Sequence, residues 1–110
     1  MLNQIILVGR LTGEPTTKEL ESGKKVSNIT LAVSRSYKNA DGIYETDFID
    51  CVVWEQMVKN VEEYCHKGDV LGIKGRIQTR EIEKEDGSKT YKLEVIAEKI
   101  SVLSSKKEEE

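Results

Sequence analysis

The most informative segment of this 110-residue chain reads Thr46-Asp-Phe-Ile-Asp-Cys-Val-Val-Trp54. Successive side chains of a β-strand point to opposite faces, so small apolar side chains at every second position, beginning at Ile49, share one face. Two large aromatic side chains, Phe48 and Trp54, lie on the other. Outward-facing apolar side chains mark either a binding surface or a subunit interface, and this strand alone leaves both interpretations open.

Four other segments carry strand patterns: residues 4–12, 25–37, 69–80 and 91–103. Apolar residues three or four positions apart predict a helix over residues 56–67, which Gly68 would end. Five strands with one helix between the third and the fourth is the order of an OB-fold, an all-β Greek-key barrel. An SH3-like barrel is the nearest alternative, but it lacks a full helix at that point. We expect one OB-fold domain over residues 1–103 and a polar tail over residues 104–110.

The charge balance limits the class of partner without excluding nucleic acid. The chain has 17 Lys and Arg against 20 Asp and Glu, a net charge of −3, which argues against a strongly basic nucleic-acid binder. Basic residues nevertheless predominate in residues 1–40 and 66–92, where an anion-binding face can form. The longest uncharged apolar run, residues 5–8, is far too short to cross a membrane. We expect a soluble, cytoplasmic protein without membrane contact.

We expect neither a catalytic site nor a metal site. His66 is the only histidine, and Cys51 and Cys65 are the only cysteines, so one chain cannot form a four-ligand zinc site from these residue types alone. The acidic residues between positions 41 and 50 could be read as a nuclease metal site, but a solvated loop and strand edge is the simpler interpretation. We therefore expect that this protein is not an enzyme and has no cofactor.

The expected strand over residues 69–80 carries a polar and basic stripe on its outward face. Its members are Lys74, Arg76, Gln78 and Arg80. By itself such a stripe is often only a solvated face. Beside the outward aromatics it predicts a groove for a single-stranded polyanion, in which cations follow the phosphates and aromatic rings stack on the bases.

The end of the expected strand over residues 25–37 repeats this combination with Arg35, Tyr37 and Lys38. Tyr37 has the same parity as the core residues Leu31 and Val33. It therefore reaches the groove only if the strand bulges or twists.

Five segments match a known pattern in order along the chain: Met1-Leu-Asn-Gln-Ile-Ile-Leu-Val-Gly-Arg-Leu-Thr12, Asn28-Ile-Thr-Leu-Ala-Val33, Asp47-Phe-Ile-Asp-Cys-Val-Val-Trp54, Tyr64-Cys-His-Lys-Gly68 and Gly75-Arg-Ile-Gln-Thr-Arg80. Together they resemble the bacterial single-stranded DNA-binding protein (SSB) family. The resemblance implies an OB-fold, a homotetramer, and nonspecific binding of single-stranded DNA during replication, recombination and repair, in the cytoplasm and on the nucleoid.

The resemblance also implies roles for individual residues. The family's stacking aromatics match Tyr37, Phe48 and Trp54, and its basic positions match Lys38, Lys67 and Arg80. Ile82 stands where the family often has a further aromatic, so it can pack against a sugar or base but cannot stack; with Tyr91 it frames the hairpin over residues 82–90. Glu55-Gln56 replaces another basic position, which weakens phosphate contact there. The family's first strand helps to form a dimer seam, in agreement with the apolar pattern of residues 4–12.

The C-terminus departs from the family pattern. Typical members continue through a Gly/Gln/Pro-rich linker to an acidic tip with a terminal apolar dipeptide, whereas this chain ends in Lys106-Lys-Glu-Glu-Glu110. We expect a tailless or truncated form that coats DNA without recruiting proteins through an acidic tail. Two other hypotheses remain open: an RNA-binding or primosome-type OB module, and an interaction module whose outward aromatics are buried between subunits.

Overall fold

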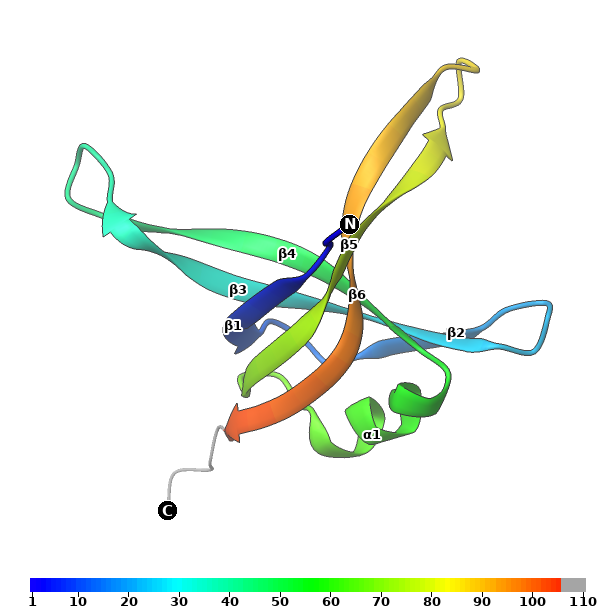
Figure 1. The fold of residues 1–110 in the computed structure, drawn as a ribbon, viewed down its shortest axis with the longest axis horizontal. Coiled ribbons are helices and arrows are strands. Elements are labelled where there is room, and N and C mark those ends of the chain that lie inside the picture. Colours follow the sequence, from blue (N-terminus) through cyan, green and yellow to red (C-terminus); the bar gives the residue numbers. More distant parts are fainter. Residues whose placement is uncertain (106–110) are drawn as a thin grey trace.

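The computed structural model describes residues 1–105 as a barrel with three projecting hairpins and one helix (Figure 1). The elements are β1 (Ile5–Leu11), β2 (Thr16–Glu19), β3 (Lys25–Lys38), β4 (Tyr44–Trp54), α1 (Gln56–Tyr64), β5 (Val70–Glu83) and β6 (Lys89–Ser104). The strand order is β1-β5-β6-β4-β3-β2, and a further pairing of β1 with β3 closes the barrel. All pairings are antiparallel except that of β4 with β6. The OB-fold prediction is therefore confirmed.

The barrel interior is filled by the alternate positions that the sequence predicts. Cys51 and Val53 of β4 are fully buried, and they meet Leu71 and Ile73 of β5 in one apolar cluster. The helix α1 closes one end of the barrel with the buried side chains of Val58 and Val61, and other members of its apolar stripe join the same cluster. This cluster is the main apolar core, and a second, smaller buried cluster consists of Val26, Val52 and Ile96.

The helix is shorter than predicted. It ends at Tyr64 instead of residue 67, because Cys65 adopts an extended conformation (φ −111°, ψ 123°) that leaves its side chain buried in the core. The backbone N–H of His66 then donates to Asp69 Oδ2 at 2.9 Å. Gly68 has φ +95° in this connecting turn, and its N–H donates to the Leu11 carbonyl at 2.8 Å. Gly68 therefore serves the turn into β5 and does not end the helix.

Pairing extends the predicted strands and adds a short one. Residues 16–19, for which the sequence predicts no strand, form β2 against β3. β5 and β6 continue to Glu83 and Lys89, where a turn with Gly87 at φ +88° joins them. Within residues 1–105 the one helix spans nine residues, which is too short to cross a membrane. The expected tail begins at Ser104, the last residue of β6, and its residues 106–110 lie outside the described part of the chain.

Candidate nucleic-acid interface

The strand register creates one continuous outward face around Phe48 and Trp54, which we call the aromatic face. Residues paired directly across neighbouring strands point to the same side of a sheet. The aromatic face consists of Lys18 of β2; Val26, Asn28, Thr30 and Ala32 of β3; Phe48, Asp50, Val52 and Trp54 of β4; Lys92, Glu94 and Ile96 of β6; and Arg76, Gln78 and Arg80 of β5. Phe48 is 69% exposed and Trp54 is 39% exposed.

Trp54 and Arg80 meet in a shallow pocket of about 220 Å³ on this face. Lys18 also lines the pocket, and within residues 1–105 it forms no ion pair. The sequence prediction missed Lys18 because residues 16–19 alternate over too few positions to indicate a strand beside Gly13 and Pro15. Here an aromatic ring, the cation of Lys18, and Arg80 with its partner Glu94 surround one depression, which suits a stacked base and its phosphate.

The β3–β4 hairpin adds a second pair of an aromatic ring and a cation. Tyr44 has the same parity on β4 as Phe48 and is largely exposed. Lys38 is its cross-strand partner, and the Lys38 ammonium lies 5.6 Å from the centre of the Tyr44 ring. Extending the alternation of β4 backwards by one further step would have identified Tyr44 from sequence. Lys38 thus has an aromatic partner and keeps its charge available for a phosphate.

The sequence predicts that Tyr37 reaches the groove only if β3 bulges or twists at its end, and β3 is irregular there. The register shifts between Ser34 and Lys38, so strict alternation does not constrain Tyr37, whose side chain is 63% exposed. Arg35 has a different environment. Its guanidinium donates to Asp47 at 2.9 Å and to Glu45 at 2.8 Å. Both carboxylates belong to the face of β4 opposite to Phe48, so the structure does not bring Arg35 together with the aromatic face.

The basic stripe of β5 divides between two parts of the surface. Arg80 and Arg76 lie on the aromatic face and pair with carboxylates of β6: Arg80 with Glu94 at 3.3 Å and Arg76 with Glu98 at 3.6 Å. Lys74 lies beside Ile6 of β1 in a separate depression of about 260 Å³.

The remaining expected contact residues lie at three further places. Ile82 pairs with Thr90 near the tip of the β5–β6 hairpin, on the same side as Arg80. Tyr91 pairs with Glu81 and points to the opposite side of that hairpin. Lys67 lies in the turn between α1 and β5, where its backbone N–H donates to Glu14 Oε2 at 2.9 Å. Of these three residues, only Ile82 shares a side with the aromatic face.

The acidic residues near the aromatic face serve as partners of cations. Asp47 binds Arg35, and this ion pair lowers the pKa of the Asp47 carboxyl group. Asp50 accepts hydrogen bonds from Lys92 and from Thr30, which lower the pKa of its carboxyl group. Within residues 1–105 no three potential metal ligands cluster. Burial raises the pKa of the Cys51 thiol to about 12, so this side chain stays protonated and unreactive.

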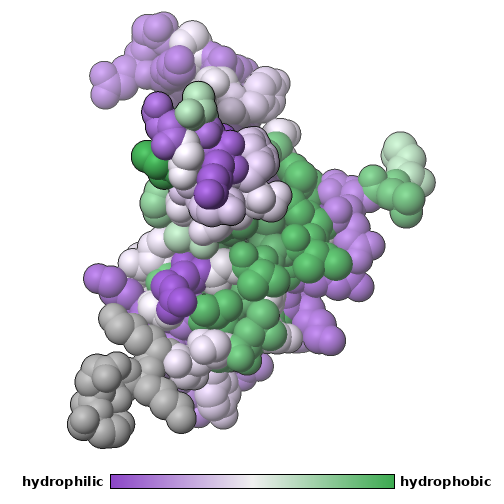
Figure 2. All heavy atoms as spheres, turned by 90° about the vertical axis from the view of Figure 1, so that its left-hand side faces the viewer, coloured by the Kyte–Doolittle hydropathy of each residue, from purple (hydrophilic) through white to green (hydrophobic). Residues whose placement is uncertain are grey.

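Exposed apolar side chains gather on a second surface, away from the aromatic face. Ile6 and Val8 of β1 point outward opposite Lys74 and Gly72 of β5, and Leu103 of β6 lies close by. Figure 2 shows apolar side chains in one continuous area on the right of the view, the side on which β1 lies. Contiguous apolar patches of this kind mark interaction surfaces. We call this area the β1 face.

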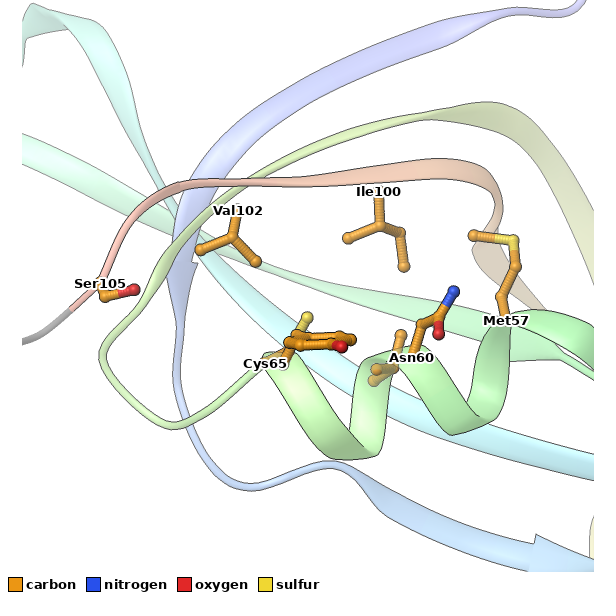
Figure 3. Close-up of a pocket in the computed structure, with 8 residues that line it drawn as sticks. Met57, Asn60, Cys65, Ile100, Val102 and Ser105 are labelled. Atoms are coloured by element: carbon orange, nitrogen blue, oxygen red, sulfur yellow. The ribbon is translucent and has the colours of Figure 1, made fainter.

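A cavity of about 510 Å³ lies between α1 and the end of β6. Figure 3 shows Met57 and Asn60 of the helix below Ile100 and Val102 of the strand. Its lining is mainly apolar and includes none of the expected DNA-contact residues.

Comparison with known proteins agrees with this geometry. The family model described as the single-strand binding protein family matches residues 2–103. "Single-stranded DNA-binding protein B" of Bacillus subtilis is 43% identical over 99% of this chain and 96% of its own length. "Single-stranded DNA-binding protein 3" of Listeria innocua is 44% identical over 96% of this chain and 66% of its own length. For "Single-stranded DNA-binding protein" of Lactiplantibacillus plantarum these values are 44%, 100% and 55%, so the chain spans about half of that relative. With this match and this barrel, the chain belongs to the single-strand binding protein family.

Proposed function

We propose that this protein binds single-stranded DNA with little sequence preference, as a homotetramer, and protects it during replication, recombination and repair in the cytoplasm. The observation that carries the proposal is the pocket on the aromatic face that combines Trp54, Arg80 and Lys18. An aromatic ring accepts any base, because every base has a flat π-face, and cations beside it attract the phosphates. The names of the similar proteins point to the same ligand.

The proposed path of the strand follows the exposed aromatics. Bases stack on Trp54 and Phe48 along β4 and then on Tyr37 or Tyr44 at the hairpin. Lys18, Lys38 and Arg80 contact phosphates along this path, and Ile82 packs against a sugar or base. Lys67, Lys74 and Tyr91 lie away from the aromatic face, so they would contact only a strand that continues around the molecule.

The proposed tetramer uses the β1 face. The exposed side chains of Ile6 and Val8 form an apolar surface for a partner subunit. The strand β1 that carries them could align with β1 of that subunit. Burying exposed apolar area stabilises association by about 25 cal/mol per Å² before the cost of ordering the subunits.

The intrinsic fluorescence of Trp54, the only tryptophan, tests the proposal directly. Titration with oligo-dT should quench this fluorescence, and higher salt should weaken the binding because phosphate contacts release counterions. Anisotropy of a labelled oligo-dT measures the affinity independently, and an RNA of equal length used as a competitor separates DNA from RNA binding.

Two variants make the test specific to the aromatic face. Phe48→Ala should weaken oligo-dT binding by about 1–3 kcal/mol, the range for one stacked base. Tyr64→Ala removes an exposed aromatic from α1 and should leave the affinity unchanged. Equal effects of the two substitutions, or no quenching together with no change in anisotropy, would refute the proposal.

A further inference from the structure

Asp50 places a negative charge in the middle of the aromatic face. It lies on β4 between Phe48 and Val52, on the same side of the strand as Phe48 and Trp54. Two residues along a strand span roughly 6.6 Å, so Asp50 is about one such step from Phe48 and two from Trp54. A DNA strand whose bases stack on both rings must therefore pass over this carboxylate.

The charge is exposed and already has a cationic partner. The Asp50 side chain is 44% exposed, and its Oδ2 lies 2.9 Å from Lys92 Nζ. Thr30 Oγ1 donates to Oδ1 at 2.9 Å. These contacts lower the pKa of the carboxyl group, so it remains ionised near neutral pH. Lys92 lies on the aromatic face but is neutralised by this neighbour.

We propose that Asp50 limits the affinity of this protein for single-stranded DNA, because its carboxylate competes with DNA phosphate for Lys92 at a point between the two stacking rings. This inference rests on the proposed function. Asp50 is then a residue that makes the bound strand easier to displace. Lys92 is a cation that would bind phosphate if the Asp50 carboxylate did not neutralise it.

Asp50→Asn tests the competition. The amide keeps the size of the side chain and the oxygen that accepts from Thr30, so the strand should fold as before. Titration of labelled oligo-dT should show about two- to fivefold tighter binding, the range for one exposed ion pair. The slope of log affinity against log salt should steepen by about 0.7, as expected for one more phosphate contact to a single strand. Asp50→Ser, which also removes the charge, should act in the same direction.

Controls separate this local effect from a change in net charge. Glu63→Gln removes one negative charge, as Asp50→Asn does, but from an exposed position of α1, and it should leave binding unchanged. Lys92→Gln alone should have little effect, because Lys92 is already paired. In the Asp50→Asn background, however, Lys92→Gln should abolish the gain.

The outcomes are distinguishable. If the wild type binds oligo-dT but Asp50→Asn binds no tighter, or if the double variant keeps the gain, the inference is wrong and the proposed function stands. A loss confined to oligo-dC would mean that the carboxylate accepts a hydrogen bond from the base amino group, and would also overturn the inference. If the wild type does not bind DNA at all, the proposed function itself fails.

Discussion

Arg35 and Lys38 lie three positions apart at the end of β3, but their partners differ. The Arg35 guanidinium is held by Asp47 and Glu45, and this pairing raises the pKa of Arg35 further above its usual value. Lys38 faces the ring of Tyr44, and within residues 1–105 it forms no ion pair. A phosphate must compete with two carboxylates for Arg35, whereas no acidic group of residues 1–105 pairs with Lys38.

Exchange of each cation for glutamine should therefore have unequal effects on DNA binding. Lys38→Gln should weaken oligo-dT binding by about two- to fivefold and flatten its salt dependence, as for the loss of one phosphate contact. Arg35→Gln should change the affinity by less than about twofold, because its charge is already neutralised. Anisotropy titrations at two salt concentrations provide the comparison. A larger loss for Arg35→Gln would contradict this order and would mean that DNA displaces Asp47 from Arg35.

At the scale of the elements, Gly75 of β5 lies tightly against the backbone of β6. A Cβ added at Gly75 would collide with the carbonyl oxygen of Ile96, a backbone atom that cannot rotate away. Gly75→Ala should thus lower the free energy of unfolding by about 1–3 kcal/mol, the usual cost of overpacking. Urea denaturation followed by circular dichroism measures this change. Gly13→Ala is the matched control, since an added Cβ there meets no atom within 4 Å.

If Gly13→Ala were the more damaging of the two substitutions, the steric explanation would be wrong. Gly75→Ala should also perturb DNA binding less than it perturbs stability, because the glycine lies on the core side of β5 while Arg76 and Gln78 carry the outward surface.

The alternation of apolar and polar residues correctly predicted the strands β4 and β5. The inward positions of β4 and β5 follow from period-two alternation, which also puts Phe48 and Trp54 outside. The exceptions depend on contacts distant in sequence. The early end of α1 results from the burial of Cys65 and from a hydrogen bond between Gly68 and Leu11. Neither contact has a local signal, so the apolar pattern predicts a helix that is too long.

The residues of the candidate site also divide into those that local alternation predicts and those that depend on contacts distant in sequence. The aromatics of the site can be found by parity, but the ion pairs of each cation cannot. Lys18 joins the site only because β2 pairs with β3, and Arg80 acquires Glu94 only through the pairing of β5 with β6. The identity of the partner decides whether a basic residue can hold a phosphate, and that identity depends on strand register.

At the scale of the whole molecule, a net charge of −3 is compatible with binding a polyanion. Charges separated by more than about 10 Å are largely screened at 0.1 M salt. The cations beside the bound DNA strand therefore affect its binding more than the net charge of the chain does. A single aromatic face with few free cations should nevertheless bind weakly. Association of subunits through the β1 face would increase the affinity, because one strand could then contact several aromatic faces at a high effective concentration.

Val8→Lys tests this link between assembly and affinity. Val8 is exposed on β1, so lysine should not disturb the core, but a charge should disrupt an apolar interface between β1 faces. Sedimentation velocity should show a smaller assembly than the wild type. Leu93→Lys, at an exposed apolar position on the β5–β6 hairpin, should leave the assembly intact.

The same variant should affect long and short DNA differently. Val8→Lys should retain wild-type affinity for an oligo-dT that covers only one aromatic face, because none of the residues proposed to contact DNA has changed. It should lose at least about tenfold for an oligo-dT long enough to contact several subunits, since linked sites gain about 10² to 10⁴ over one site. An unchanged mass would exclude the β1 face as the interface. A smaller mass with unchanged affinity for long DNA would mean that each subunit binds on its own, so that the tetramer would not be needed for tight binding.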